Sequence, residues 1–195
     1  PKKQWTSVIN QTLGFVYQES KQDLDAAISS YQSAYLLTPK DIDIYVNLGS
    51  AFYDKEDYDN ALAVYRNALD LDPKNAKIHC NLGFLYWGKG DTDEAIREYE
   101  YAIEYDKSYS IAYNNLGVIY LDDLGRVKEA IDMFKKAVEY NPNYALAHFN
   151  LARSIAITGE KIEAAKLYQI AQDVNKITNE IDPQDITDKI NALFD

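Results

Sequence analysis

A tripeptide recurs along this chain at an almost constant interval. Asn-Leu-Gly occurs at residues 47–49, 81–83 and 115–117, with a looser copy, Asn-Leu-Ala, at 150–152 and a weaker one, Thr-Leu-Gly, at 12–14. The equivalent Gly or Ala positions are 34 or 35 residues apart. A fixed period of this length is typical of repeat architectures, in which each unit is one supersecondary element that stacks on the next.

Each unit contains two amphipathic segments, which we interpret as two helices. In the second unit Ile44, Leu48 and Phe52 follow a helical period. The polar stretch 54–57 then separates them from a second periodic run over 61–69. A Pro closes three of the units, since Pro disfavours helical angles in the residue before it, at positions 39, 73 and 142.

Small residues occur at fixed positions in both segments of each unit. A Gly inside a helix costs roughly 0.5–1 kcal/mol relative to Ala, so its recurrence in the first helix requires a packing benefit. We expect this Gly to face the Ala of the second helix, such as Ala61 or Ala95, so that the two backbones approach closely. Stacked hairpins bury a continuous core that one hairpin cannot, so we expect a single domain over 1–195.

Spacing, small positions, aromatic positions and closing Pro together resemble the tetratricopeptide repeat family over residues 7–176. The resemblance implies an all-α fold, a right-handed superhelical solenoid of antiparallel helix hairpins. The five repeats would span about 7–39, 42–73, 76–107, 110–142 and 145–176. The first and fourth units depart from the pattern by one extra residue each, around Lys21 and around 122–125.

A bulky side chain precedes the repeated tripeptide in every unit but the first, which has Asn10 at that position; the others are Tyr45, His79, Tyr113 and His148. After the repeats, Asp182 and Pro183 form a helix N-cap with Pro at the first helical position. The apolar residues that follow share one helix face: Ile186, Ile190, Leu193 and Phe194. This segment, 183–194, is similar to the capping helix that covers the end of such arrays.

The resemblance implies that the first helices line a concave groove, and Asn recurs there. An Asn amide carries two donors and an acceptor, so it can pair with a peptide group without reading its side chain. Aromatic residues in the same groove would anchor a ligand. The candidate groove residues are Asn47, Tyr53, Lys77, Asn81, Phe84, Trp87, Asn114, Asn115, Phe149, Asn150 and Arg153. The alternative is structural: duplication copied an Asn that serves local packing, and the aromatic residues belong to the core between repeats.

The chaperone-binding carboxylate clamp of this family requires Lys and Asn in one unit, Asn in the next, and Lys and Arg in a third. In the best register Asn47 and Lys77 match, whereas Gln11, Phe15 and Asn81 do not. Because two cations are missing, we exclude the C-terminal carboxylate of a chaperone as the ligand.

Charge and composition argue against several other classes. The net charge of −11 repels phosphate backbones, so we expect no nucleic acid partner. Clustered bases occur only at positions 2–3 and 135–136. No apolar run approaches the ~18 residues that span a bilayer, so we expect no membrane insertion of this fragment. The single Cys80 cannot form an internal disulfide and fits a reducing, cytoplasmic location.

We find no catalytic or metal-binding constellation in the sequence, and we predict a protein that is not an enzyme and needs no cofactor or metal. His79 and His148 occupy the bulky position between helices, and we interpret them as packed or hydrogen-bonded core residues. Gly88-Lys89-Gly90 falls far short of a phosphate-binding loop.

The sequence therefore predicts a protein-interaction scaffold that binds a peptide or protein segment in its groove. Two alternatives remain: the targeting or substrate-recruiting fragment of a larger enzyme or secretion machine, and a self-assembling scaffold that forms a homo-oligomer. The chain begins at Pro1 without Met, which indicates a fragment, while its end just after the expected capping helix argues against a C-terminal extension.

Overall fold

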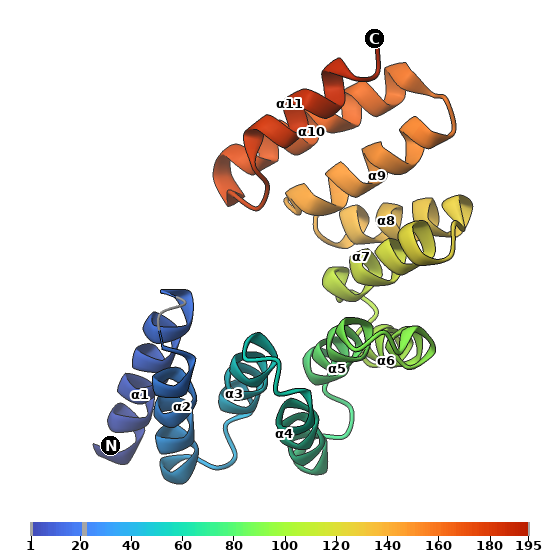
Figure 1. The fold of residues 1–195 in the computed structure, drawn as a ribbon. Coiled ribbons are helices and arrows are strands. Elements are labelled where there is room, and N and C mark those ends of the chain that lie inside the picture. Colours follow the sequence, from blue (N-terminus) through green and yellow to red (C-terminus); the bar gives the residue numbers. More distant parts are fainter. Residues whose placement is uncertain (1, 21–22, 195) are drawn as a thin grey trace. The chain divides into compact units, whose positions relative to one another are not determined.

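A computed structural model describes residues 2–20 and 23–194, and in these ranges the chain is all-α, with five helical hairpins followed by one C-terminal helix (Figure 1). The first three hairpins are α1 (Lys2–Glu19) with α2 (Leu24–Leu37), α3 (Ile42–Asp54) with α4 (Tyr58–Leu71), and α5 (Ala76–Gly88) with α6 (Thr92–Tyr105). The last two are α7 (Ser110–Val118) with α8 (Val127–Tyr140) and α9 (Ala145–Ile157) with α10 (Lys161–Thr178); α11 (Pro183–Asn191) follows.

The chain forms two compact units, Pro1–Tyr105 and Asp106–Asp195. We call them the N-terminal unit, which contains α1 to α6, and the C-terminal unit, which contains α7 to α11. A single domain over 1–195 stays a prediction. The five hairpins lie within the ranges expected for the repeats, except that α1 begins at Lys2, ahead of residue 7, and α10 ends at Thr178, beyond residue 176.

Side-chain caps start several of these helices where the sequence places Asp or Asn. The Asn75 Oδ1 atom accepts a hydrogen bond from the Ile78 N–H at 3.2 Å, and Asp182 accepts one from the Gln184 N–H at 2.8 Å. Such caps satisfy backbone N–H groups that have no partner within the helix. Pro183 then occupies the first helical position, as predicted for α11.

The Gly of the repeated tripeptide faces an aromatic ring, and the expectation that it faces an Ala was wrong. A Cβ atom on Gly83 would lie 2.8 Å from Tyr99 Cε1, and one on Gly117 would lie 2.7 Å from Phe134 Cε1. Both rings are fully buried. The missing Cβ therefore makes room for a ring of the second helix, which packs directly on the backbone of the first.

In the second to fifth hairpins, the bulky residue ahead of the tripeptide forms a hydrogen bond with the turn before the hairpin. The Tyr45 hydroxyl donates to the Pro39 carbonyl at 2.7 Å, and the Tyr113 hydroxyl donates to the Lys107 carbonyl at 3.2 Å. His148 Nε2 lies 2.9 Å from the equivalent carbonyl oxygen, that of Pro142. In each case the partner is six residues earlier, so this position serves the connection between repeats.

The extra residue of the fourth repeat is accommodated as a π-helical turn, η1 (Ile119–Asp123), which continues α7. The Leu124 N–H donates to the Ile119 carbonyl five residues earlier, at 3.2 Å. A π-helical turn absorbs one inserted residue without ending the helix. The corresponding extra residue of the first repeat, around Lys21, lies outside the described residues.

The C-terminal helix covers the last hairpin, as the sequence predicts. Ile186 of α11 is buried in the core of the C-terminal unit, and Leu193 is buried in the turn that follows. Ile190 is half-buried, but Phe194 is exposed, so not every apolar residue of 183–194 joins the covered face. Figure 1 shows α11 lying along α10.

Candidate functional site

The first helices of the N-terminal unit, α1, α3 and α5, pack in series and present polar side chains along one face, which we call the first-helix face. The Lys77 ammonium on α5 lies 2.8 Å from Asp43 Oδ1 on α3, and both side chains are exposed. Gln18 on α1 donates to Ser50 Oγ at 3.1 Å and to Asp54 Oδ2 at 2.6 Å. These contacts hold neighbouring first helices in register.

Asn47 and Asn81 occupy equivalent positions of α3 and α5, between those charged and polar contacts. Both side chains are half-buried. Neither amide makes a side-chain hydrogen bond within the described part of the chain, although each amide carries two donors and one acceptor oxygen. The N-terminal unit thus has two half-buried amides that make no side-chain hydrogen bond within the described residues.

An aromatic cluster lies farther along the same two helices. The Tyr53 and Phe84 ring centroids are 4.9 Å apart, those of Phe84 and Trp87 are 6.2 Å apart, and Tyr58 packs 5.5 Å from Tyr53. Phe84 keeps 41% of its surface exposed. Burial, with the nearby Tyr58 and Asp54, raises the pKa of Tyr53 above its ordinary value.

Tyr53 also explains Gly88, which ends α5. A Cβ atom at Gly88 would collide with the Tyr53 ring and hydroxyl, so the space beside Trp87 is filled by Tyr53. Tyr53, Phe84 and Trp87 therefore form one continuous aromatic surface with Phe84 as its most exposed member.

In the C-terminal unit the equivalents of Asn47 and Asn81 are Asn115 and Asn150, and both form a hydrogen bond with Asn114, the residue before Asn115. The Asn150 amide on α9 donates to Asn114 Oδ1 on α7 at 3.0 Å, and the Asn114 amide donates to Asn115 Oδ1 at 3.3 Å. Asn114 and Asn150 are buried, whereas Asn115 is half-buried. The Asn150–Asn114 bond joins α9 to α7, whereas the Asn114–Asn115 bond lies within α7.

The remaining candidate residues of the C-terminal unit are also engaged. The Phe149 ring packs edge-on against Tyr168, with centroids 5.4 Å apart, and belongs partly to the core. Arg153 forms an ion pair with Asp122. Sequence reasoning missed these pairings because the partners are 19 to 36 residues away.

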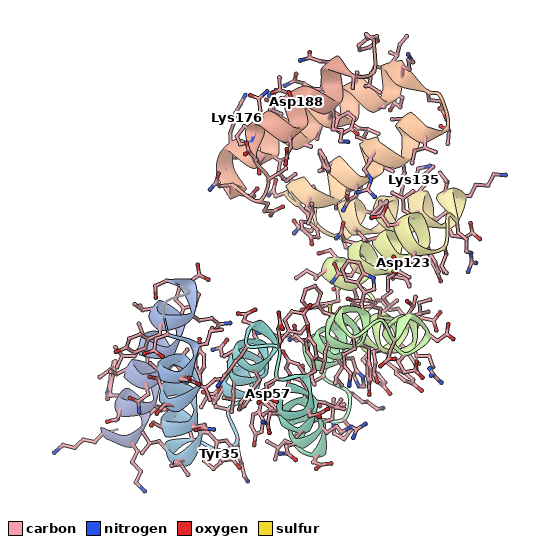
Figure 2. All side chains as sticks on the ribbon, in the orientation of Figure 1. Tyr35, Asp57, Asp123, Lys135, Lys176 and Asp188 are labelled. Atoms are coloured by element: carbon pink, nitrogen blue, oxygen red, sulfur yellow. The ribbon has the colours of Figure 1, made fainter. Side chains whose placement is uncertain are left out.

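A separate cavity of about 300 Å³ opens between α2, α3 and α4 of the N-terminal unit. Its apolar wall includes Tyr35, which Figure 2 labels on α2, together with Tyr45, Leu48 and Phe52. Gln32, Asn60 and Asn67 supply polar groups. The lining contains no carboxylate, imidazole or thiol.

No group of three or more His, Cys, Asp and Glu side chains is arranged to hold a metal ion within 2–20 and 23–194. In the same ranges no helix combines the length and hydrophobicity that a membrane span requires.

Comparisons with known proteins relate the chain to helical repeat proteins. The family described as TPR repeat matches residues 20–55 and 49–90, and the family described as tetratricopeptide repeat matches 80–138 and 119–186. A comparison with curated protein sequences gave no match.

Solved structures share the fold at low sequence identity. Yeast Tom70 has a TM-score of 0.83 and 19% identity over 96% of this chain and 40% of its own. MamA has a TM-score of 0.62 and 24% identity over 91% of this chain and 97% of its own. YrrB, described as a TPR protein with an unusual peptide-binding site, has a TM-score of 0.56 and 21% identity over 86% of both chains.

Proposed function

Because the chain belongs to the tetratricopeptide repeat family, whose members mediate protein–protein interactions, we propose that it binds a partner protein segment on the first-helix face of the N-terminal unit. One observation carries the proposal: the half-buried amides of Asn47 and Asn81 have no hydrogen-bond partner in the described structure and lie on the helices that carry the aromatic cluster. That YrrB, of the same fold, has a peptide-binding site supports the choice of ligand class.

The two amides suit the backbone of a peptide. Each can accept from a peptide N–H and donate to a peptide carbonyl, and their equivalent positions on α3 and α5 repeat the same pair of contacts. A ligand that covered them without bonding to them would leave buried polar groups unsatisfied, at a cost of about 1–3 kcal/mol each. The amides therefore select a ligand with regularly spaced donors and acceptors.

The aromatic cluster supplies apolar anchoring. Phe84 is exposed while Tyr53 and Trp87 support it on both sides, so an apolar ligand side chain on Phe84 would contact all three rings. Rigid aromatic side chains often carry much of the binding energy in protein interfaces. The exposed Asp43–Lys77 pair marks the polar margin of the surface.

Selection from a phage-displayed library of random dodecapeptides tests the proposal. We expect wild-type protein to enrich peptides whose affinity falls by about 1–3 kcal/mol in Asn47→Ala/Asn81→Ala. The matched control is Asn67→Ala/Asn143→Ala, which removes two exposed amides elsewhere and should leave affinity unchanged.

A Phe84→Ala variant tests the aromatic anchor separately, because it removes the most exposed ring without touching either amide. The proposal fails if the enriched peptides bind the Asn47→Ala/Asn81→Ala variant as tightly as wild type while circular dichroism shows the fold intact. Asn114 and Asn150, which bond to each other, are assigned a structural role in the proposal.

Self-association is a second candidate function, and the outer face of α1 favours it. Trp5, Ile9 and Val16 are 71%, 57% and 55% exposed. The equivalents of Ile9 and Val16 on α3 are Ile44 and Ala51, and both are fully buried. A second copy that covered α1 would bury its exposed apolar side chains.

Light scattering over a concentration series measures this directly. Ile9→Glu/Val16→Glu should lower the mass of any oligomer, whereas Leu36→Glu/Ile177→Glu, at exposed apolar positions on α2 and α10, should not. A monomer mass for wild type at every concentration would remove self-association.

A further inference from the structure

The C-terminal unit contains a cavity of about 330 Å³ between α9, α10 and the turn that follows α11. Its charged lining consists of Arg153 on α9, Lys161 at the start of α10 and Lys189 on α11. No acidic residue lines it. The chain as a whole carries 31 acidic against 20 basic residues, so a cavity with three cations and no acid departs from the general balance. We call it the basic pocket.

Two of the three cations have no ion pair in the described structure. Arg153 binds Asp122, but a guanidinium has five N–H donors and one carboxylate occupies only some of them. Lys161 and Lys189 form no salt bridge with any residue in 2–20 or 23–194, and both are exposed. The pocket therefore offers positive charge that the protein itself does not neutralise.

The floor of the basic pocket is apolar. Ala156 and Ile157 of α9 and the buried Leu193 contribute to it. Tyr168 of α10 also lines the pocket, and burial raises its pKa against the opposing effect of Arg153. An apolar floor beneath a cationic rim suits a ligand that carries both features.

We propose that the basic pocket binds an acidic segment of a partner protein, with carboxylate side chains on Arg153, Lys161 and Lys189 and an aliphatic side chain on the floor. Charge complementarity carries this choice of ligand, because unpaired cations in an otherwise acidic protein attract carboxylates. A nucleic acid fits less well, since its run of phosphates would extend beyond the three cations over a chain whose net charge is −11. The capping helix then has a second role, as it contributes Lys189.

Titration with a defined peptide, followed by ¹⁵N–¹H NMR, tests the proposal. The probe is acetyl-Glu-Leu-Glu-Leu-Glu-amide, whose charges come only from side chains, and its neutral match replaces each Glu by Gln. We expect saturable shifts of backbone amides in α9, α10 and α11 with the acidic peptide, weakening as salt is added. The neutral peptide should produce none.

Lys161→Gln/Lys189→Gln should raise the dissociation constant about tenfold or more, because it removes both unpaired ammonium groups. The matched control, Lys128→Gln/Lys135→Gln, removes the same charge from exposed positions on α8, where Figure 2 labels Lys135. It should bind as wild type. Both positions of the test pair are exposed, so an unchanged spectrum outside the pocket should confirm that each variant folds.

Three outcomes would overturn the proposal: no saturable shifts in wild type, equal shifts with the neutral peptide, or equal losses in the test and control pairs. The last would indicate general electrostatic attraction only. The result is independent of the function proposed for the N-terminal unit, because Asn47→Ala/Asn81→Ala leaves every residue of the basic pocket in place.

Discussion

His79 Nδ1 on α5 lies 2.7 Å from Glu98 Oε2 on α6, and its Nε2 lies 3.1 Å from the Pro73 carbonyl oxygen. Both partners only accept hydrogen bonds, so both ring nitrogens can donate only when the imidazole is protonated. Burial lowers the pKa of His79, but the hydrogen bonds to Glu98 and Pro73 outweigh it, and the pKa lies above its ordinary value.

We predict that this pair makes the folded protein less stable as the pH rises. A raised folded-state pKa means that the contribution is fully present below the unfolded value of about 6.5 and is lost as pH rises through the folded pKa. In thermal unfolding between pH 5.5 and 9, the stability difference between wild type and His79→Gln should shrink with rising pH.

The matched control is His148→Gln, at the equivalent position of the fifth repeat. The fifth repeat has Leu167 at the position of Glu98, and the buried Nδ1 of His148 has no partner within the described residues. A stability difference between wild type and His79→Gln that stays constant over this pH range would contradict the prediction.

Glu56 is predicted to weaken the second hairpin. The turn between the two helices has a positive φ at Gly90, Gly125 and Gly159, but the equivalent residue of the second repeat is Glu56, with φ of 61°. A left-handed conformation costs a side-chain-bearing residue about 1–2 kcal/mol. Gly avoids this cost but loses more chain entropy on folding, which offsets roughly 0.5–1 kcal/mol of the gain. We expect Glu56→Gly to raise the free energy of unfolding by about 0.5–1 kcal/mol in urea denaturation.

Glu56→Ala separates backbone strain from loss of the carboxylate, because Ala retains a Cβ atom. It should give no gain, and an equal gain in both variants would point to charge instead.

The contact between Gly83 and Tyr99 predicts a cost for adding one methyl group. A Cβ atom at Gly83 would lie within 3 Å of three Tyr99 ring atoms, and that ring is fully buried. Overpacking of a core typically costs about 1–3 kcal/mol. Ala is also the better helix former, which stabilises the variant by about 0.5–1 kcal/mol relative to Gly. Gly83→Ala should therefore destabilise the protein by about 1–2 kcal/mol in urea denaturation.

The same substitution in a Tyr99→Leu background tests the assigned cause. Without the ring, Gly83→Ala should be neutral or stabilising. If Gly83→Ala lowers the free energy of unfolding equally in both backgrounds, a clash with the Tyr99 ring is not the cause.

Asn175 is predicted to hold the capping helix in place. Its amide donates to the Ile181 carbonyl at 2.6 Å, and its Oδ1 accepts from the Ile181 N–H at 2.9 Å, across the turn between α10 and α11. Asn175→Ala leaves both backbone groups without this partner, at about 1–3 kcal/mol. Hydrogen exchange of the α11 amides should speed up more than exchange in α9.

Asn175→Asp is the graded control, since the carboxylate still accepts from Ile181 but no longer donates. Its α11 exchange should fall between that of wild type and that of Asn175→Ala. Unchanged exchange in the Ala variant would show that core packing of Ile186 alone secures the helix.

Local chemistry made the hairpins predictable. Pro39, Pro73 and Pro142 stop helices wherever they occur, and Asp182 with Pro183 start one, so the boundaries could be read without tertiary information. The role of Gly83 could not be derived in the same way. The sequence led us to expect that Gly83 faces an Ala of the second helix. In the structure, the relative rotation of the two helices places the Tyr99 ring against Gly83 instead.

The sequence by itself determined the period, the hairpins and the family, because these depend on spacing and on short-range backbone preferences. Only the tertiary structure decided which of the equivalent Asn side chains form hydrogen bonds within the described residues. Asn47 and Asn81 are half-buried and form none, whereas Asn150 is buried and donates to Asn114. It alone also gathered Arg153, Lys161 and Lys189, which are too far apart in sequence to form a basic cluster. Burial and charge proximity depend on distances between helices, which a repeat pattern does not encode residue by residue.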